Sequence, residues 1–218
     1  LVNPACFDLE WRRVKRSYRN QKRVLFGVLK QENTPRLETE RLILRKFQHD
    51  DLEDVFRIYS DLEVNTFLPW FPLRSMDEAR AYLAHTILPE YEKKIAYRYA
   101  IVEKTSQTVI GYVSLNGIDE GKCCADLGYG LRKEAWRKGY MSEACRAVLQ
   151  RAKEAGFRFL TATHDVNNPA SGEVMKAIGM TYRYSYDEQW QPKNFKVTFK
   201  LYPVSYTHLR AHETGRNL

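Results

Sequence analysis

From Arg36 onward, the chain alternates between segments with the two-residue periodicity of strands and segments with the longer periodicity of helices. Helices are expected after Asp50, after Ser75, after Met141 and from Pro169 to Ile178. An ordered alternation of this kind predicts helices packed in layers on a sheet, the α/β (α+β) class. The expected strands are 40–47, 97–103, 109–115, 126–131, 159–164, 182–186 and 195–201.

Capping residues mark several of these helix ends. Ser75 followed by Glu78 forms a capping box, and Asn168 followed by Pro169 suits an N-cap and a first helical turn. Gly156 and Gly179 are placed to end the last two helices. The strands 97–103 and 109–115 are expected to form a hairpin.

The composition is that of a soluble globular domain, with 44% hydrophobic and 28% charged residues in 218. No apolar run approaches the roughly 18 residues of a membrane span, and the N-terminus lacks a secretory signal pattern. The four cysteines, of which Cys123 and Cys124 are adjacent, do not suggest a disulfide framework. We therefore expect a cytoplasmic protein with reduced thiols.

The formal net charge of +8 is concentrated near the N-terminus. Residues 1–34 hold eight basic and three acidic residues, whereas residues 35–202 hold 25 basic and 23 acidic ones. Because the chain begins without Met, we expect residues 1–34 to be a basic extension, non-native or disordered, with the native start near Val28 or Leu29. A nucleic-acid-binding arm at 12–23 is the alternative, and no nucleic acid is expected at the nearly neutral body.

The C-terminal residues 203–218 show no periodicity, and Val204 to Thr214 resembles the in-frame translation of a sequencing-library adapter. We expect an adapter-derived tail and set it aside, together with His208 and His212. The adjacent Cys123 and Cys124 do not match the ligand spacing of a zinc site. No metal is therefore expected.

Residues 128–143 combine a strand, a basic turn that contains glycine, and the start of a helix. Gly128 and Gly130, inside the strand, indicate a bulge or the close approach of a ligand. The start of a helix exposes unpaired N–H groups and the positive end of its dipole, which suits a phosphate. Gly139 would let the anion approach the main chain, and Arg137 and Lys138 add charge. The patterns GxxxxGK[ST] and GxGxxG are absent, which excludes the common nucleotide loops.

This segment resembles the acetyl-CoA loop of the GNAT (Gcn5-related) N-acetyltransferase superfamily, and in particular its ribosomal-protein alanine/serine N-acetyltransferase branch. The loop pattern Gln/Arg-x-x-Gly-x-Gly/Ala falls on Trp136-Arg-Lys-Gly-Tyr-Met141. The branch patterns Asn-x-x-Ser and Lys-x-x-Gly-Phe fall on Asn168-Pro-Ala-Ser171 and Lys176-Ala-Ile-Gly-Met180. The resemblance covers residues 36 to 202, with Trp136 in place of the first Gln/Arg and Met141 in place of the last small residue.

The resemblance implies a GNAT-like acyl-CoA N-acyltransferase fold in residues 35–202. Its mixed, mainly antiparallel sheet of six to seven strands would carry helices on both faces and splay between the fourth and fifth strands. Acetyl-CoA would bind there without a metal, its pantetheine arm paired with a bulged strand around Tyr129 to Leu131. The implied cofactor-binding residues are Tyr129, Gly130, Leu131, Trp136, Arg137, Lys138, Gly139, Tyr140, Met141, Asn168 and Ser171.

Three residues are implied in catalysis. The N–H of Leu131 would face the thioester carbonyl, where one such donor contributes about 3 kcal/mol. Asp126 matches the strand position of the family's glutamate base and would act through a water molecule, with a carboxylate that is merely at an edge or exposed as the alternative. Ser171 or water would serve as the acid, because Met175 stands where many relatives have a tyrosine.

The expected reaction is direct attack of a primary amine on acetyl-CoA in a ternary complex. At pH 7.4 about a fifth to a third of an α-amine is neutral, against about one lysine in a thousand, which favours a protein or peptide N-terminus such as that of a ribosomal protein. The alternatives are a polyamine- or aminoglycoside-type acceptor and a catalytically idle CoA-binding module. We expect a monomer or homodimer with no membrane partner. Candidate acceptor-site residues are Trp70 and Phe71 at the mouth and the acidic Asp119, Glu120, Asp187 and Glu188.

Overall fold

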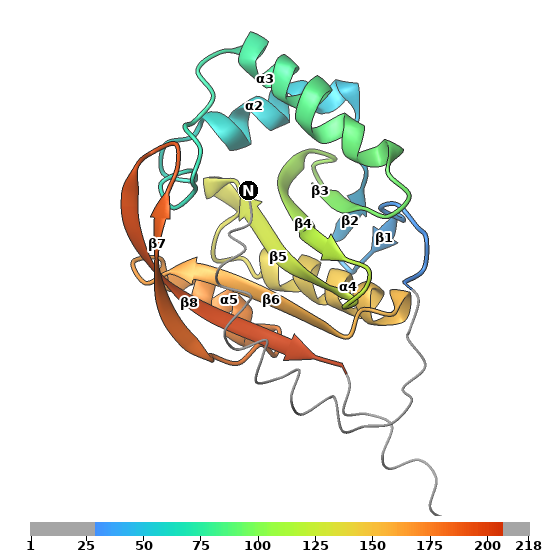
Figure 1. The fold of residues 1–218 in the computed structure, drawn as a ribbon. Helices are drawn as coiled ribbons and strands as arrows, with labels where there is room; N and C mark the ends of the chain where they lie inside the picture. The colour runs from blue at the N-terminus through green and yellow to red at the C-terminus, as the bar shows by residue number, and fades with distance from the viewer. Residues whose placement is uncertain (1–28, 207–218) are drawn as a thin grey trace, which may run out of the picture.

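The computed structural model describes residues 29–206, which form one eight-stranded sheet in the order β1-β2-β3-β4-β5-β6-β8-β7 (Figure 1). All neighbouring strands are antiparallel except β5 and β6, which are parallel. The predicted mixed, mainly antiparallel sheet is confirmed, and the eighth strand is the two-residue β1, too short to leave a periodic pattern. The strands are β1 Leu37–Glu38, β2 Leu42–Arg45, β3 Tyr97–Glu103, β4 Val109–Asp119, β5 Cys124–Leu131, β6 Phe159–Asp165, β7 Tyr184–Trp190 and β8 Phe195–Ser205.

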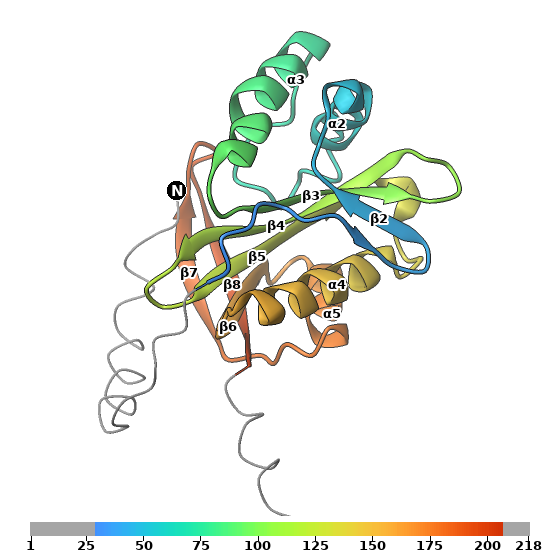
Figure 2. The ribbon, with the colours of Figure 1, turned by 90° about the vertical axis from the view of Figure 1, so that its right-hand side faces the viewer.

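Helices cover both faces of the sheet, as predicted (Figure 2). The helices α2 and α3 lie on one face and α4 and α5 on the other. Each pair of helices buries its own apolar cluster against the sheet, which is the reason for the layered arrangement. Within residues 29–206, no helix combines the length and the apolar character needed to cross a membrane. The helices are α2 Leu52–Ser60, α3 Met76–Tyr82 with its continuations η2 Leu83–Ile87 and η3 Leu88–Glu92, α4 Tyr140–Ala155 and α5 Pro169–Ala177, with short 3-10 turns η1 His49–Asp51 and η4 Lys133–Ala135.

The predicted capping residues lie at the helix ends. The Ser75 hydroxyl accepts a hydrogen bond from the N–H of Glu78 at 3.2 Å, and the Asn168 side chain accepts one from the N–H of Ser171 at 3.2 Å. Gly156 ends α4 in the left-handed region at φ 98°. These contacts satisfy main-chain groups that a helix leaves unpaired at its ends, so the chain direction changes at defined points.

The packed chain extends beyond the expected domain limits of 35–202. On the N-terminal side Leu29 is buried, and the N–H of Lys30 donates to the carbonyl of Ala155 at 2.9 Å. On the C-terminal side Pro203 to Ser205 continue β8 alongside β6. Residues 1–28 and 207–218, with the rest of the basic extension and of the proposed tail, lie outside the described residues.

The splay predicted between the fourth and fifth strands lies between β5 and β6. These two strands pair only at Cys124–Asp126 with Phe159–Thr161. Beyond that point β5 continues to Leu131 paired with β4 alone, while β6 remains paired with β8. The inner edge of β5 therefore faces an opening in the sheet.

The bulge predicted around Tyr129 to Leu131 is wrong, because the register between β4 and β5 is regular from Asn116↔Asp126 to Gly111↔Leu131. The strand glycines have another cause, the crowding of β4 side chains against β5. A Cβ on Gly130 would lie 2.6 Å from the ring of Tyr112, and one on Gly128 would lie 2.7 Å from the amide nitrogen of Asn116. The glycines make room for these two side chains.

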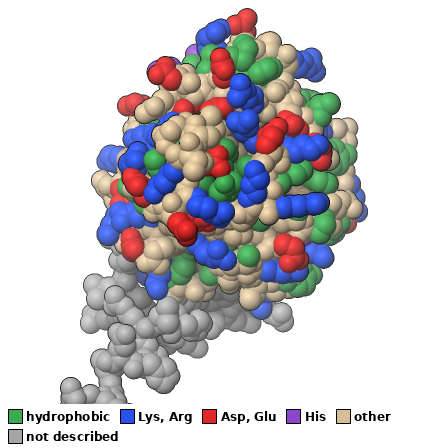
Figure 3. All heavy atoms as spheres, turned by 180° about the vertical axis from the view of Figure 1, so that it is seen from behind, with side chains coloured by type: hydrophobic (Ala, Val, Ile, Leu, Met, Phe, Trp, Pro, Cys, Tyr) green, Lys and Arg blue, Asp and Glu red, His purple; other side chains and the backbone are tan. Residues whose placement is uncertain are grey.

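The back of the molecule carries both signs of charge. Figure 3 shows Lys and Arg side chains interspersed with Asp and Glu over this face, as expected for the nearly neutral body. A nucleic-acid surface would gather basic side chains in one patch or stripe. This face offers no such patch.

The close approach of Tyr112 gives a stability prediction. Gly130→Ala should lower the free energy of unfolding by about 1–3 kcal/mol, because the added methyl group overpacks a regular strand. Denaturant unfolding measures this change. Gly121→Ala is the control, since a Cβ there meets nothing closer than 3.4 Å. Adding Tyr112→Leu to Gly130→Ala should restore part of the loss, and strict additivity of the two changes would contradict the explanation.

Candidate active site

A cavity of about 2080 Å³ occupies the splay of the sheet. Its walls include β5, β6, the start of α4, the start of α5, the loop after α2 and the β7–β8 hairpin, and the cavity extends over β3 and β4 toward α2 and α3. Of the predicted residues, Phe71 and Lys138 are not on these walls, and the Phe71 side chain is 54% exposed. The predicted site residues on the walls are Trp70, Asp126, Tyr129, Gly130, Leu131, Trp136, Arg137, Gly139, Tyr140, Met141, Asn168 and Ser171.

The open edge of β5 presents main-chain groups to this cavity. The N–H of Arg132 donates to the carbonyl of Ile110 at 2.8 Å, so the alternation of a strand turns the N–H groups of Leu131 and Tyr129 away from β4. On that side β6 has already separated from β5. The Leu131 carbonyl accepts a hydrogen bond from the indole N–H of Trp136 at 2.7 Å. Trp136 thus ties the following turn to the strand, and the Leu131 N–H faces the opening.

The turn before α4 leaves a series of main-chain N–H groups without acceptors. Arg137 and Gly139 both adopt the left-handed region, at φ 59° and 78°, and Gly139 is the N-cap of α4. The first helical hydrogen bond runs from the N–H of Glu143 to the carbonyl of Gly139 at 3.1 Å. Among residues 29–206, the N–H groups of 137–142 have no acceptor. Together with the helix dipole, they form a site suited to an anion.

A carboxylate in the first turn of α4 anchors the start of this helix to the turn between β1 and β2. Glu143 accepts hydrogen bonds from the Thr39 hydroxyl at 2.6 Å and from the main-chain N–H of Arg41 at 3.0 Å, and it forms an ion pair with the Arg41 guanidinium at 2.6 Å. Arg41 also donates to the carbonyl of Lys138 at 2.9 Å and stacks over the ring of Tyr140. Burial alone would raise the pKa of Glu143, but these donors outweigh it and lower the pKa.

The residues of this anchor were not predicted from the sequence. An acidic residue such as Glu143 is favourable in the first turn of any helix, so its presence does not indicate which residues it contacts. Thr39 and Arg41 lie about a hundred positions earlier, and only the packing of α4 beside β1 and β2 brings them together.

The start of α5 closes another side of the cavity. The Tyr129 hydroxyl is hydrogen bonded to Ser171, 2.9 Å from its carbonyl and 3.0 Å from its hydroxyl oxygen. Asn168 acts here as the helix cap described above. Met175, one turn further along α5, is buried in the core at 1% exposure. Ser171 therefore links the start of α5 to β5 through Tyr129.

Asp126 stands where β5 and β6 separate. It is the last β5 residue paired with β6, and its carboxylate accepts a hydrogen bond from the Thr161 hydroxyl. Burial raises the pKa of Asp126, and the Thr161 hydrogen bond offsets only part of this effect. The side chain is half-buried and lines the cavity. Asp126 is thus not an exposed edge carboxylate.

Of the four acidic residues considered for an ammonium group, only Glu188 lines this cavity. Asp119 and Asp187 form ion pairs with Lys122 and Lys196, each at 2.6 Å, and Glu120 is exposed. Burial raises the pKa of Glu188. The alternation of β7 explains the difference, since 184, 186, 188 and 190 are half-buried and the residues between them are exposed.

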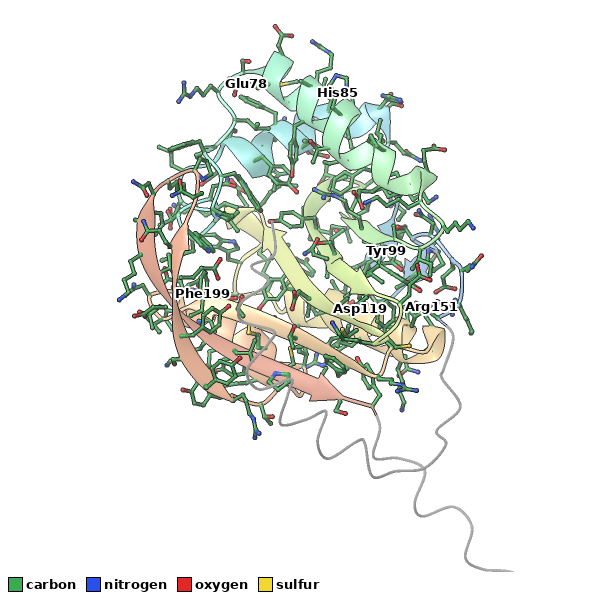
Figure 4. The ribbon with its side chains drawn as sticks, viewed as in Figure 1. Glu78, His85, Tyr99, Asp119, Arg151 and Phe199 are labelled. Carbon is green, nitrogen blue, oxygen red and sulfur yellow. The ribbon has the colours of Figure 1, made fainter. Side chains whose placement is uncertain are left out.

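An aromatic wall on the β7–β8 hairpin faces β5 across the opening. The ring of Phe199 lies 5.7 Å from that of Tyr186 and 4.9 Å from that of Trp190. Figure 4 shows Phe199 on this hairpin, at the opposite side of the molecule from Arg151. The Lys193 side chain links the hairpin to the loop after α2 by donating to the Asn65 carbonyl at 3.1 Å. Within the same loop, the indole N–H of Trp70 donates to the side-chain oxygen of Asn65 at 3.3 Å.

The cysteines in residues 29–206 take no part in this cavity. Cys123, Cys124 and Cys145 are buried, and burial raises the pKa of Cys124 to about 12. Within the same residues, no group of three His, Cys, Asp or Glu side chains is placed to hold a metal ion.

Comparisons with known proteins identify the family to which this fold belongs. Residues 41–181 match the family model described as acetyltransferase (GNAT) domain, and the chain therefore belongs to the GNAT acetyltransferase family. The uncharacterized N-acetyltransferase YoaA of Bacillus subtilis is 28% identical over 146 residues, which are 66% of this chain and 82% of YoaA. The protein is an N-acetyltransferase.

Two solved structures share the fold. The microcin C7 self-immunity acetyltransferase MccE, in complex with acetyl-CoA and AMP, superposes with a TM-score of 0.68 at 17% identity, over 77% of this chain and 93% of the other. The ribosomal-protein-S5-alanine acetyltransferase of Vibrio fischeri superposes with a TM-score of 0.64 at 20% identity, over 80% of this chain and 98% of the other.

The burial of Asp126 gives a prediction about stability and pH. Its pKa is raised above the ordinary 3.8, so ionisation costs the folded state stability that is fully present below pH 3.8 and lost above the raised pKa. Asp126→Asn removes that cost. At pH 7 the variant should melt at a higher temperature than the wild type, and the difference should shrink as the pH falls toward 3.8.

Asp187→Asn is the matched control for this measurement. Lys196 lowers the pKa of Asp187, so the control variant should gain no stability at pH 7. A melting temperature of Asp126→Asn below that of the wild type at pH 7 would show that the carboxylate stabilises the fold.

Proposed function

We propose that this N-acetyltransferase uses acetyl-CoA to acetylate a protein or peptide N-terminal α-amine, by direct attack in a ternary complex. One observation carries the proposal. The unpaired N–H groups of residues 137–142 and the open edge at Tyr129 and Leu131 meet in a single cavity. This arrangement suits a ligand with a diphosphate at one end and an amide chain that can pair with a strand.

The residues at the splay fit this ligand. The N–H groups of 137–142 at the start of α4 would hold the diphosphate, and the β5 edge would pair with the amides of the pantetheine arm. Lys138 would contribute through its main chain, whose carbonyl Arg41 already holds. When bound, acetyl-CoA supplies an activated thioester. The family match and the acetyl-CoA complex of the related fold support this assignment.

Leu131 provides the electrostatic part of catalysis. Its N–H lies on the open edge of β5, where it would donate to the carbonyl oxygen that gains negative charge during amine attack. One such donor is worth about 3 kcal/mol of barrier. Holding the amine close to the carbonyl carbon contributes up to about 7–11 kcal/mol.

Asp126 and Ser171 would handle the protons. A carboxylate with a raised pKa is a better base near neutral pH, and Asp126 would take the amine proton through a water molecule. Ser171, hydrogen bonded to Tyr129, is the hydroxyl placed to supply a proton to the leaving thiolate. Met175, buried in the core, takes no part.

The basicity of the amine favours a protein or peptide N-terminus as the acceptor. An α-amine is far more often neutral at pH 7.4 than a lysine, so a single carboxylate base suffices. The related fold named as a ribosomal-protein-S5-alanine acetyltransferase supports the same class of acceptor.

The left-handed turn gives a binding prediction. Gly139→Ala should weaken the affinity for CoA by about tenfold or more, because a side chain at φ 78° strains the turn that presents the N–H groups. Gly179→Ala is the matched control, with similar strain at φ 87° and a position off the cavity wall. Titration calorimetry with CoA measures both variants. Equal affinities would contradict the assigned diphosphate site.

Thiol release from acetyl-CoA tests the reaction and its acceptor. Short peptides with free N-termini should give a higher kcat/KM than spermidine or an aminoglycoside, while Asp126→Asn should lower kcat by about a hundredfold. Asp187→Asn should leave the rate unchanged. Turnover restricted to the polyamine or aminoglycoside would overturn the acceptor class, and CoA binding without thiol release on any amine would indicate an idle module.

A further inference from the structure

Arg98 on β3 brings a positive charge to the cavity wall without a carboxylate to balance it. Among residues 29–206, no Asp or Glu forms an ion pair with its guanidinium. The Nη2 group donates to the hydroxyls of Tyr82 at 3.0 Å and Tyr59 at 3.5 Å. The Nε atom is buried and has no hydrogen-bond acceptor. The Nη1 atom also has no acceptor within the described chain, but it is not one of the fully buried atoms.

Other shielded arginines of the described chain are neutralised. Arg45, Arg132 and Arg151 have side chains 19%, 19% and 22% exposed, and each forms an ion pair with a carboxylate, from Asp51, Asp54 and Glu32 respectively. A shielded charge that lacks such a partner costs the fold free energy. Unlike these three arginines, Arg98 therefore has guanidinium N–H groups that remain available to bind an anion.

Arg98 belongs to the same face of the sheet as Asp126. It pairs with Ser114 on β4, which pairs with Gly128 on β5, two positions from Asp126. Two strand spacings separate β3 from β5 by about 10 Å. Between Arg98 and Asp126 on this face lie the Ser114 hydroxyl and the Asn116 amide, which are hydrogen bonded to each other, and both residues line the cavity. The cavity extends over this row to Tyr59, Tyr82 and Thr86.

We propose that Arg98 binds a carboxylate of the acceptor, so that the substrate is an amine that carries a negative charge near its nitrogen. The inference rests on the proposed acetyl transfer to an amine near Asp126. A guanidinium recognises a carboxylate by charge-assisted hydrogen bonds, and the free Nη1 donors are the ones available. Two sources fit this chemistry, namely the α-carboxylate of a free amino acid and an acidic side chain at a peptide N-terminus.

Pairs of acceptors with matched shape and different charge test the proposal, and the ratio within each pair is compared between wild type and variant because a carboxamide also lowers the pKa of the neighbouring amine. Alanine and serine are compared with their carboxamides, and the peptide amides Asp-Ala and Glu-Ala with Asn-Ala and Gln-Ala. The wild type should prefer the acid member by about 10- to 100-fold in kcat/KM, mainly through KM. The first set identifies a free amino acid as the acceptor, and the second identifies a peptide with an acidic first residue.

Substitution of the arginine then assigns the preference. Arg98→Gln should raise KM for the acid and leave the amide unchanged, while Arg98→Lys should retain part of the preference. A merely structural role would affect both members equally. Arg151→Gln is the control, since this arginine lies off the cavity, at the other side of the molecule from Phe199 (Figure 4), and its loss should leave the acid-to-amide ratio unchanged.

The outcomes separate this inference from the proposed function. Acetylation of acid and amide at equal rates, or a preference that survives Arg98→Gln, would overturn the role of Arg98 and leave the acetyl transfer intact. Should no amine release thiol, the proposed function fails. Calorimetry of the same acid and amide pairs with the CoA-bound wild type and Arg98→Lys would still test Arg98, with tighter binding of the acid expected and equal binding contradicting the proposal.

Discussion

The change of partner along β5 is the constraint on which the rest of the site depends. Its first residues pair on both edges, and after Asp126 the β6 edge is left open. A main-chain N–H that is not paired in a sheet needs another hydrogen-bond acceptor. The opening beside β5 therefore exposes N–H groups that still require such acceptors. Because β6 is fixed to β8 and β5 to β4, the two halves of the sheet hold this edge open.

The fold was largely predictable from the sequence, because strand and helix periodicities and the capping residues Ser75, Asn168 and Gly156 are local signals. The splay followed from the family resemblance. The predicted bulge was wrong because an interior glycine has several causes, and the one that applies here, the Tyr112 ring over Gly130, is a contact between neighbouring strands. A sequence shows the glycine but does not show the side chain that requires it.

The candidate site was likewise only partly predictable from the sequence. Its main-chain part, from Trp136 to Met141, was readable because the turn and the helix start are continuous in sequence. The supporting residues were not, since Glu143 meets Thr39 and Arg41, and Arg98 meets Tyr59 and Tyr82, through packing between distant elements. Among the acidic residues, the alternation of β7 separated Glu188 from Asp187 only once its register with β8 was known.

The bonds around Glu143 bear on the thermodynamics of ligand capture. A loop that must order itself on binding loses conformational entropy, and this loss is subtracted from affinity. Here three donors and the stacked ring of Tyr140 already fix the helix start. The anion pocket is thus preorganised by the turn between β1 and β2, and changes at Thr39 or Arg41 would alter the entropy of association although neither residue is assigned a contact with the ligand.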